Sequence, residues 1–153
     1  MRPLRPICLN DFLRQFYEDN RPDMELSGQT FALELPDTAL SVDGDEDRLR
    51  SALENLCYNA LSFTPKTGTV TLSLRREDSW AVISVRDTGA GIEPNHLPHV
   101  FDRGFTRRSD GGGEGMGLFI VRAIALEHGG TVDVRSRLGE GSTFTLRLPL
   151  SGK

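Results

Sequence analysis

The sequence predicts a two-layer α/β sandwich in which a mixed, mostly antiparallel sheet packs on three helices. Its 153 residues match the usual size of one domain, so the whole chain, 1–153, is expected to fold as a single unit. Four segments alternate apolar and polar residues, as strands with one buried and one exposed face do. Helical patterns separate these strands. Strands of a doubly wound parallel sheet are buried on both faces and would not alternate, so that fold is disfavoured.

The N-terminal part of the chain predicts one helix and a short strand. Asn10 is expected to cap a helix over about residues 10–20, and Arg21 and Pro22 would end it. Residues 31–35 alternate apolar and polar side chains and predict a strand that ends at Pro36.

An acidic segment, residues 43–47, comes directly before a second helical pattern at about 46–62. Carboxylates favour a helix N-terminus because they cap free N–H groups and interact with the positive end of the helix dipole. This explanation is preferred over a metal site.

The remaining elements follow from the same two periodicities. A third helix is expected at about 116–128, and Gly129-Gly130 would end it. The stretch 88–115 is too long for an ordinary connection, which indicates a functional segment. The residues expected to face the core from the four alternating strands are Val70, Leu72 and Leu74; Ala81, Ile83 and Val85; Val132 and Val134; and Phe144, Leu146 and Leu148.

Composition excludes several classes of protein. A net charge of −4, from 18 basic and 22 acidic residues, gives no chain-wide basic surface for nucleic acid or anionic lipid. No apolar run approaches the roughly 18 residues that span a bilayer, and the N-terminus does not resemble a signal peptide. Cys8 and Cys57 are too few for a disulfide framework. We therefore expect a cytoplasmic chain with two reduced thiols that contacts neither nucleic acid nor membrane.

The second helix carries two stripes of residues. Asn55, Asn59 and Ser62 lie to one side of its apolar stripe, in an arc that also includes Arg48. A single amide there is an ordinary surface residue. Two amides on one face, with a glycine-rich loop later in the chain, make a magnesium or phosphate site plausible, because amide oxygens suit hard cations. The apolar stripe itself consists of Leu49, Leu53, Leu56 and Ala60.

Asp87 is in phase with the apolar residues of its strand, so its carboxylate should point to the buried face. A buried acceptor at a strand end could take a hydrogen bond from an exocyclic amine such as that of adenine. Gly89 and Gly91 would allow a ligand to approach the backbone closely. The alternative is an Asp that accepts a hydrogen bond within its own turn, and the position alone does not separate the two.

The glycine-rich segment 111–117 opens directly into the third helix. Free N–H groups at a helix N-terminus form a natural cradle for phosphate, whereas a flexible linker seldom opens into a helix in mid-domain. The segment matches neither a P-loop nor a dinucleotide fingerprint nor the glycine loop of protein kinases.

Five segments, 55–60, 87–92, 101–103, 113–118 and 139–144, resemble in order and spacing the N, first glycine, F, second glycine and third glycine boxes of the sensor histidine kinase ATP-binding domain. The resemblance extends from Leu9 to Leu150. It implies the Bergerat fold shared with gyrase-type ATPases, with ATP and Mg²⁺ as ligands.

The resemblance assigns roles to individual residues. Asn59 would be the magnesium ligand, with Asn55 as its polar partner in the catalytic pair, and Asp87 would bind the adenine amine. A lid would span about residues 101–113, where Arg103, Arg107 or Arg108 could offset phosphate charge. The other implied nucleotide-binding residues are Gly89, Gly91, Ile92 and Phe101; Gly113, Gly115 and Gly117 at the phosphates; Met116 and Leu118; and Thr143 near the base.

Some positions depart from the family pattern. Ser62 stands where many members have Lys, Gly104 follows the F box where many have an aromatic residue, and Glu114 adds a negative charge to the phosphate loop. Hydrolysing relatives have a general-base Glu where this chain has Asn55, and Glu54 lies about 100° away around the helix. The resemblance therefore implies transfer of the γ-phosphoryl group rather than hydrolysis.

The implied acceptor is a histidine on a separate dimerisation domain, with a response regulator as an indirect partner. None of His96, His99 and His128 has the sequence context of a family acceptor, and the acceptor hairpin is missing from these residues, so we expect a separate catalytic domain or a fragment. Two alternatives stay open: a serine-kinase regulator of a sigma factor with the same fold, and a non-catalytic nucleotide-sensing module.

Overall fold

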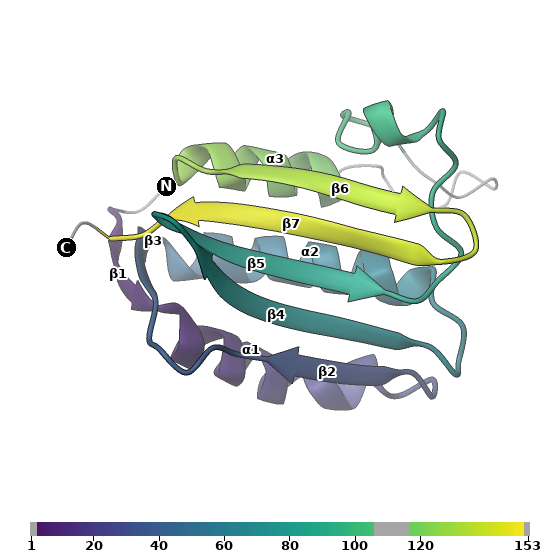
Figure 1. Cartoon of the computed structure of the whole chain (residues 1–153), viewed down its shortest axis with the longest axis horizontal. Coiled ribbons are helices and arrows are strands. Elements are labelled where there is room, and N and C mark those ends of the chain that lie inside the picture. Colours follow the sequence, from purple (N-terminus) through teal and green to yellow (C-terminus); the bar gives the residue numbers. More distant parts are fainter. Residues whose placement is uncertain (1–2, 106–116, 152–153) are drawn as a thin grey trace.

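The computed structural model describes residues 3–105 and 117–151. A five-stranded sheet in the order β2-β4-β5-β7-β6 forms one layer, and three helices cover one of its faces (Figure 1). The predicted two-layer sandwich is confirmed. The elements are β1 (Arg5–Cys8), α1 (Leu9–Met24), β2 (Thr30–Glu34), β3 (Ser41–Gly44), α2 (Glu46–Ser62), β4 (Thr69–Glu77), β5 (Trp80–Asp87), a 3-10 turn (Leu97–His99), α3 (Gly117–Glu127), β6 (Thr131–Arg137) and β7 (Gly141–Pro149).

The sheet is mixed, as predicted. Strand β2 runs parallel to β4, whereas the pairs β4-β5, β5-β7 and β6-β7 are antiparallel. A separate two-stranded sheet joins β1 to β3 at the end of the molecule where the N-terminus lies (Figure 1). The sequence did not predict β1, because a four-residue strand whose partner is more than 30 residues away leaves little local pattern.

The core lies between the helices and the inner face of the sheet. Leu72, Val85 and Phe144 lie in register across the central strands and are fully buried, together with Leu53 and Leu56 of α2. The predicted phases of β4, β5 and β7 are therefore confirmed. Val132 and Val134 of the edge strand β6 are only partly buried and pack against this core.

Helix α2 begins as the acidic segment predicts. The side chain of Asp45 accepts hydrogen bonds from the backbone N–H groups of Asp47 (3.1 Å) and Arg48 (3.3 Å), which satisfies two donors that the helix itself leaves unpaired. Across residues 3–105 and 117–151, no group of three or more His, Cys, Asp or Glu side chains is arranged to hold a metal ion.

The predicted bounds of the first helix were wrong at both ends. Asn10 does not cap it: the helix begins at Leu9, and the Asn10 side chain donates to Thr38 O (3.0 Å) and accepts from Leu40 N (2.9 Å). These bonds hold the connection between β2 and β3, a tertiary use of a typical capping residue. Pro22 lies inside the helix, which continues to Met24. Pro22 has no N–H to donate, so it removes one i→i−4 hydrogen bond, and the helix ends two residues later.

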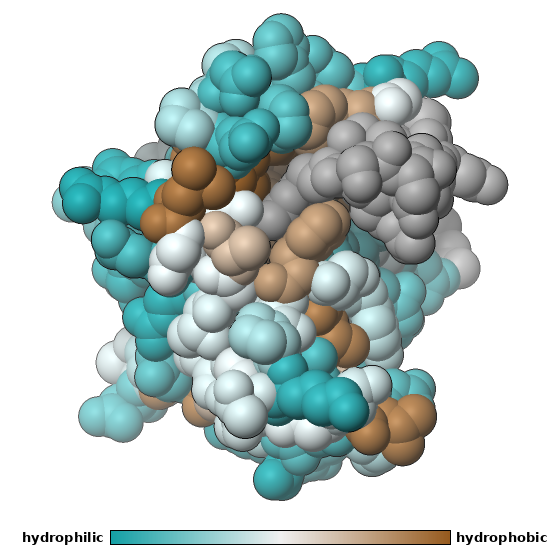
Figure 2. Space-filling view, turned by 90° about the vertical axis from the view of Figure 1, so that its right-hand side faces the viewer, coloured by the Kyte–Doolittle hydropathy of each residue, from teal (hydrophilic) through white to brown (hydrophobic). Residues whose placement is uncertain are grey.

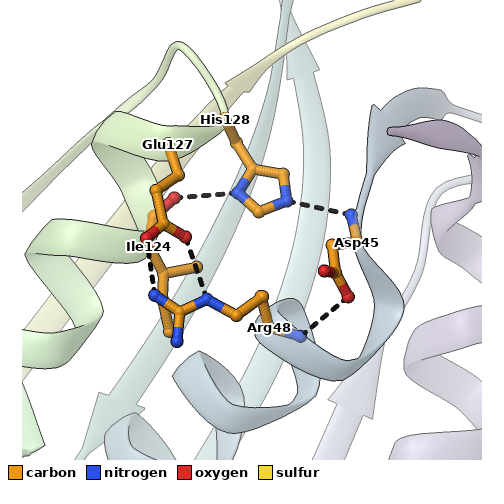
Figure 3. Close-up of polar contacts among 5 residues, drawn as sticks. All are labelled: Asp45, Arg48, Ile124, Glu127 and His128. Carbon is orange, nitrogen blue, oxygen red and sulfur yellow. Dashed lines mark hydrogen bonds and ion pairs between the residues drawn. The ribbon is translucent and has the colours of Figure 1, made fainter. Parts of the chain in front are cut away.

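Helix α3 ends at Gly129-Gly130 as predicted, with Gly130 N–H bonded to Ala125 O (2.8 Å). This end of α3 is tied to the start of α2 (Figure 3). The buried His128 ring bonds to Ile124 O through Nδ1 (2.8 Å) and accepts from Asp45 N–H through Nε2 (3.0 Å). Since Nε2 accepts, Nδ1 carries the proton of a neutral ring.

A bidentate ion pair joins the same two helix ends. Arg48 donates to the two carboxylate oxygens of Glu127 at 2.9 and 2.6 Å (Figure 3). The hydrogen bond from Arg48 lowers the pKa of Glu127, and the same bond raises the pKa of Arg48. Although Arg48 shares the arc of the two asparagines, it lies at the opposite end of α2 and serves packing between helices.

Both cysteines are free thiols, Cys8 partly buried and Cys57 fully buried. Burial raises the pKa of the Cys57 thiol. Among the helices of the described residues, none is long and apolar enough to cross a membrane.

Candidate functional site

The predicted site residues gather at one end of the molecule. The end of β5 and the β6-β7 hairpin lie at the right-hand end of Figure 1, and the C-terminal half of α2 and the start of α3 point toward this end. Figure 2 views this end directly, and its described surface mixes hydrophobic and hydrophilic residues. The topology therefore brings together segments that are far apart in the sequence.

Asp87 is the most buried carboxylate of this end, with 2% of its surface exposed. It closes the central strand β5 and lies opposite Val70 on one side and Ser142 on the other, which places its side chain on the inner face. Its Oδ1 accepts a hydrogen bond from the N–H of Gly89 (2.9 Å). Asp87 therefore forms the hydrogen bond within its own turn that the sequence left open, and its carboxylate also points toward the inner face.

Glycines surround Asp87 because the backbone segments approach too closely for a side chain. A Cβ at Gly89 would overlap the carbonyl oxygen of Phe63, and one at Gly141 would overlap that of Asp87. Gly91 and Gly141 also have φ angles of +80° and +100°, which favour glycine. The first and third glycine segments thus pack directly on the chain around the carboxylate.

The two asparagines lie one turn apart on α2, and both are half-buried. Asn55 donates from Nδ2 to Ser51 O (2.8 Å). A Cβ built on Gly117 would lie 2.9 Å from Asn55 Oδ1, so the start of α3 rests against this amide. Ser62 donates its hydroxyl to Tyr58 O (2.9 Å), back along its own helix. Asn55 thus lies against the first turn of α3, and Asn59 follows one turn later on α2.

Strand β7 places Ser142, rather than Thr143, beside the carboxylate. Ser142 lies opposite Asp87 and is 3% exposed, whereas Thr143 lies opposite Arg86 and so faces the other side of the sheet. The hydroxyl oxygens of Ser142 and Ser136 lie 2.9 Å apart, and Ser136 also accepts from the N–H of Ile92 (2.7 Å). The role of Thr143 near the base stays a prediction, and Ser142, which the sequence analysis did not single out, is the residue of β7 that lies beside Asp87.

The alternation of β7 already contained this signal. Ser142 is in phase with Phe144, Leu146 and Leu148, the residues expected to face the core, whereas Thr143 is out of phase. Strand phase constrains the direction of a side chain, and in β7 it turns Ser142 toward the face of Asp87.

The F box packs over the site end of the sheet and α3. The ring of Phe101 meets Phe144 edge-on at 5.9 Å, and the guanidinium of Arg103 lies 5.9 Å from the centre of the Phe119 ring. Ile92 and Leu118 are buried in the core. Of the remaining expected residues, Arg107, Arg108, Gly113, Glu114, Gly115 and Met116 lie outside the described residues, as does most of the expected lid at 101–113.

The histidines take structural positions. His99 Nδ1 lies 2.9 Å from a carboxylate oxygen of Asp102, and the His96 ring meets Phe105 edge-on at 5.6 Å. His128 is buried at the far end of the molecule between α2 and α3 (Figure 3).

Sequence comparisons agree with the geometry. The sequence pattern of the histidine kinase-, DNA gyrase B- and HSP90-like ATPases matches residues 44–152. Sensor protein DivL of Caulobacter vibrioides is 41% identical over 146 residues, which are 95% of this chain and 19% of DivL. Sensor histidine kinase RppB of Synechocystis is 33% identical over 150 residues, which are 95% of this chain and 33% of RppB. The chain thus spans a third or less of the length of these relatives.

Solved structures agree over nearly the full chain. The nucleotide-free catalytic domain of histidine kinase ThkA has a TM-score of 0.85 at 26% identity and covers 97% of this chain and 98% of its own. Full-length ShkA in complex with AMPPNP has a TM-score of 0.86 at 32% identity, over 98% of this chain and 32% of ShkA. A complex of ThkA with the response regulator TrrA has a TM-score of 0.81 at 25% identity, over 97% of this chain and 42% of that chain.

Proposed function

The chain belongs to the family of histidine kinase-, DNA gyrase B- and HSP90-like ATPases, and from this membership we propose that it is the ATP-binding catalytic domain of a two-component sensor histidine kinase. Two named sensor proteins cover 95% of the chain, and catalytic domains of histidine kinases share its fold. In this proposal the domain binds Mg-ATP and passes the γ-phosphoryl group to a histidine on a separate dimerisation domain.

The single observation that carries the proposal is the buried carboxylate of Asp87. It lies at the end of the central strand, on the inner face, where glycines allow neighbouring backbone segments to pack closely around it. A fixed acceptor in such a place suits the amine of adenine and opposes the carbonyl of guanine. Ser142, on the same face and directly across from Asp87, is our second candidate for contacts to the base.

The first turn of α3 and the two amides of α2 would hold the charged part of the nucleotide. Backbone N–H groups at a helix start attract phosphate, and amide oxygens suit magnesium. Asn55 already contacts Gly117, so these two features lie side by side. We assign Asn59 as the metal ligand and Asn55 as the residue that positions the start of α3 beside it. Bound magnesium would offset the negative charge of the phosphates.

In the described part of the chain, α2 presents no carboxylate one turn from Asn59 that could activate water. Asn55 occupies the place of the general base in hydrolysing relatives, and Glu54 is exposed. An amide neither accepts a proton at neutral pH nor polarises a water as a carboxylate does. In the proposal this favours transfer to a positioned acceptor over loss of the phosphoryl group to water.

The partners are proposed on the same basis. A separate dimerisation domain would supply the acceptor, because none of the three histidines has the sequence context of a family acceptor, and His128 is also buried and bonded through both ring nitrogens. A response regulator would receive the phosphoryl group in turn, in line with the complex solved for ThkA and TrrA.

Titration calorimetry with ATP, with and without Mg²⁺, tests the binding site. The wild-type chain should bind more tightly with Mg²⁺, and Asn59→Ala should remove this difference while the metal-free affinity stays. Asn95→Ala, which changes an exposed asparagine of the segment after β5, is the matched control and should bind as the wild type does. An Asn59→Ala variant with undiminished magnesium dependence would exclude Asn59 as the ligand.

A further inference from the structure

Three arginines line one depression on the outer face of the sheet, on the side opposite to Asp87. Arg86 of β5 lies opposite Thr143 of β7, and Thr143 lies opposite Arg135 of β6. Arg86, Thr143 and Arg135 therefore form a row across three adjacent strands. Arg137 follows two residues later on the same face. All three arginines are exposed. We call these three arginines the arginine row. They line a shallow cavity of about 200 Å³ together with neighbouring residues of the same strand ends, among them Asp87, Glu140 and Ser142.

These arginines differ from the others on the same face. Arg75 pairs with Glu77 at 2.8 Å, and Arg147 pairs with Asp133 at 2.6 Å. Within residues 3–105 and 117–151, Arg86, Arg135 and Arg137 form no ion pair. Glu140, at the tip of the β6-β7 hairpin, lines the same cavity and forms no ion pair with them. An acidic chain of net charge −4 therefore gathers three guanidinium groups at one place on its surface, against one exposed carboxylate.

The geometry suits one small anion. Neighbouring strands lie about 4.8 Å apart, so the backbones of Arg86 and Arg135 are separated by roughly 10 Å, with the Thr143 hydroxyl between them. Guanidinium groups present planar forks of donors that match oxyanions. A phosphate monoester carries about −1.5 to −2 charge and three acceptor oxygens, so it can engage several guanidinium groups and a hydroxyl at once. A single carboxylate offers less charge and fewer acceptors.

We propose that the arginine row binds a phosphate group on the outer face of the sheet, at a site distinct from the proposed nucleotide site on the inner face. Arg86 and Arg135 hold the group from either side, Thr143 donates to it from the middle strand, and Arg137 adds charge at the hairpin. The phosphate belongs either to free inorganic phosphate or to a phosphorylated side chain of a protein, since both present the same oxyanion.

The test is a titration of the full chain with inorganic phosphate at constant ionic strength, followed by ¹H–¹⁵N NMR. We expect saturable shifts of the arginine Nε–H signals of Arg86 and Arg135 and of the Thr143 amide. Signals of the inner face report separately on the nucleotide site, so this outcome does not depend on the proposed function. Linear, unsaturable shifts shared by Arg75 and Arg147 would overturn the proposal, because they indicate general screening.

Two double variants with the same change of net charge make the test specific. Arg86→Gln with Arg135→Gln should weaken phosphate binding at least tenfold, whereas Arg75→Gln with Arg147→Gln on the same face should leave it unchanged. Equal weakening by both would overturn the proposal. A phosphoserine peptide distinguishes the sources: tighter binding than inorganic phosphate indicates a phosphorylated protein, and equal binding indicates free phosphate.

Discussion

At the scale of single residues, Asp87 shows how strand phase sets chemistry. The residue before it, Arg86, points to the outer face, and the carboxylate itself points inward and is 2% exposed. Burying a carboxylate is costly unless hydrogen bonds compensate, and the N–H of Gly89 supplies one of them at 2.9 Å. The free-energy cost of burying this carboxylate agrees with its proposed role in binding the adenine amine.

We predict that Asp87 makes the chain select ATP over GTP. Losing a hydrogen bond to a charged group costs about 1.5–3 kcal/mol, so wild type should prefer ATP about ten- to a hundredfold. Asp87→Asn should lose most of this preference, because its amide can donate to the guanine carbonyl. Calorimetric titration with each nucleotide measures the ratio, and Asp37→Asn, an exposed carboxylate, is the control. Equal affinity of the wild type for ATP and GTP would contradict the assignment.

Gly141 provides a test of the close packing around Asp87. Gly139 and Gly141 both have positive φ, +82° and +100°, but only at Gly141 would a Cβ overlap the carbonyl oxygen of Asp87. Gly139→Ala should lower the free energy of unfolding by about 1–3 kcal/mol through backbone strain alone. Gly141→Ala should lower it by about 1–3 kcal/mol more through the overlap. Urea unfolding measures both, and equal losses would show that the backbone around Asp87 can move.

At the scale of elements, the sequence predicted whatever depends on local pattern. The core-facing residues of β4, β5 and β7, the Asp45 cap and the Gly129-Gly130 end of α3 were all confirmed. What it missed depends on partners distant in sequence. Asn10 forms hydrogen bonds with Thr38 and Leu40, which lie 28 and 30 positions later in the sequence. Strand β1 pairs with β3, which comes after both α1 and β2.

The site followed the same division. Helix spacing placed Asn55 and Asn59 on one face, and alternation turned Asp87 inward, as predicted. Ser142 was not predicted, although the alternation of β7 places it on the same face as the core residues Phe144 and Leu146. The approach of Gly117 to Asn55 joins residues more than 60 positions apart, and only the folded chain reveals it.

The ion pair between Arg48 and Glu127 should couple α2 to α3 only modestly. About a third of each side chain is exposed, 36% and 32%, so we expect a coupling free energy of about 0.2–1 kcal/mol in a double-mutant cycle with Arg48→Gln and Glu127→Gln. The same cycle on Asp11 and Arg14, an exposed pair within α1, should give less. A coupling free energy near zero would show that this ion pair does not stabilise the packing of α2 against α3.

The pH dependence of this coupling follows from the lowered pKa of Glu127. A carboxylate whose pKa is lower in the folded state stabilises the fold fully above its unfolded pKa, which is about 4.3. This contribution is lost as the pH falls through the lower folded-state value. Repeating the cycle across this range should show the coupling disappear on acidification, and a coupling that grows instead would contradict the sign.

At the scale of the whole molecule, the two faces of one sheet end have separate chemistry. The inner face carries Asp87, Ser142 and the amides of α2, and the outer face carries the arginine row. The opposite end of the molecule joins α2 to α3 through His128 and the Arg48 pair. In the proposed function, the chain holds a nucleotide with its phosphates toward the start of α3, and the acceptor comes from outside the chain.

Phosphoryl transfer tests this central claim most directly. Transfer depends on an acceptor in line with the γ-phosphate, so the chain alone should bind ATP, hydrolyse it negligibly and not label itself. Incubated with γ-labelled ATP, Mg²⁺ and the histidine-bearing helical hairpin of its cognate kinase, it should label the hairpin on an acid-labile phosphohistidine, and Asn59→Ala should abolish the label. Rapid ATP turnover by the chain alone, an acid-stable phosphoserine on the partner, or tight ATP binding with no transfer would each contradict the claim.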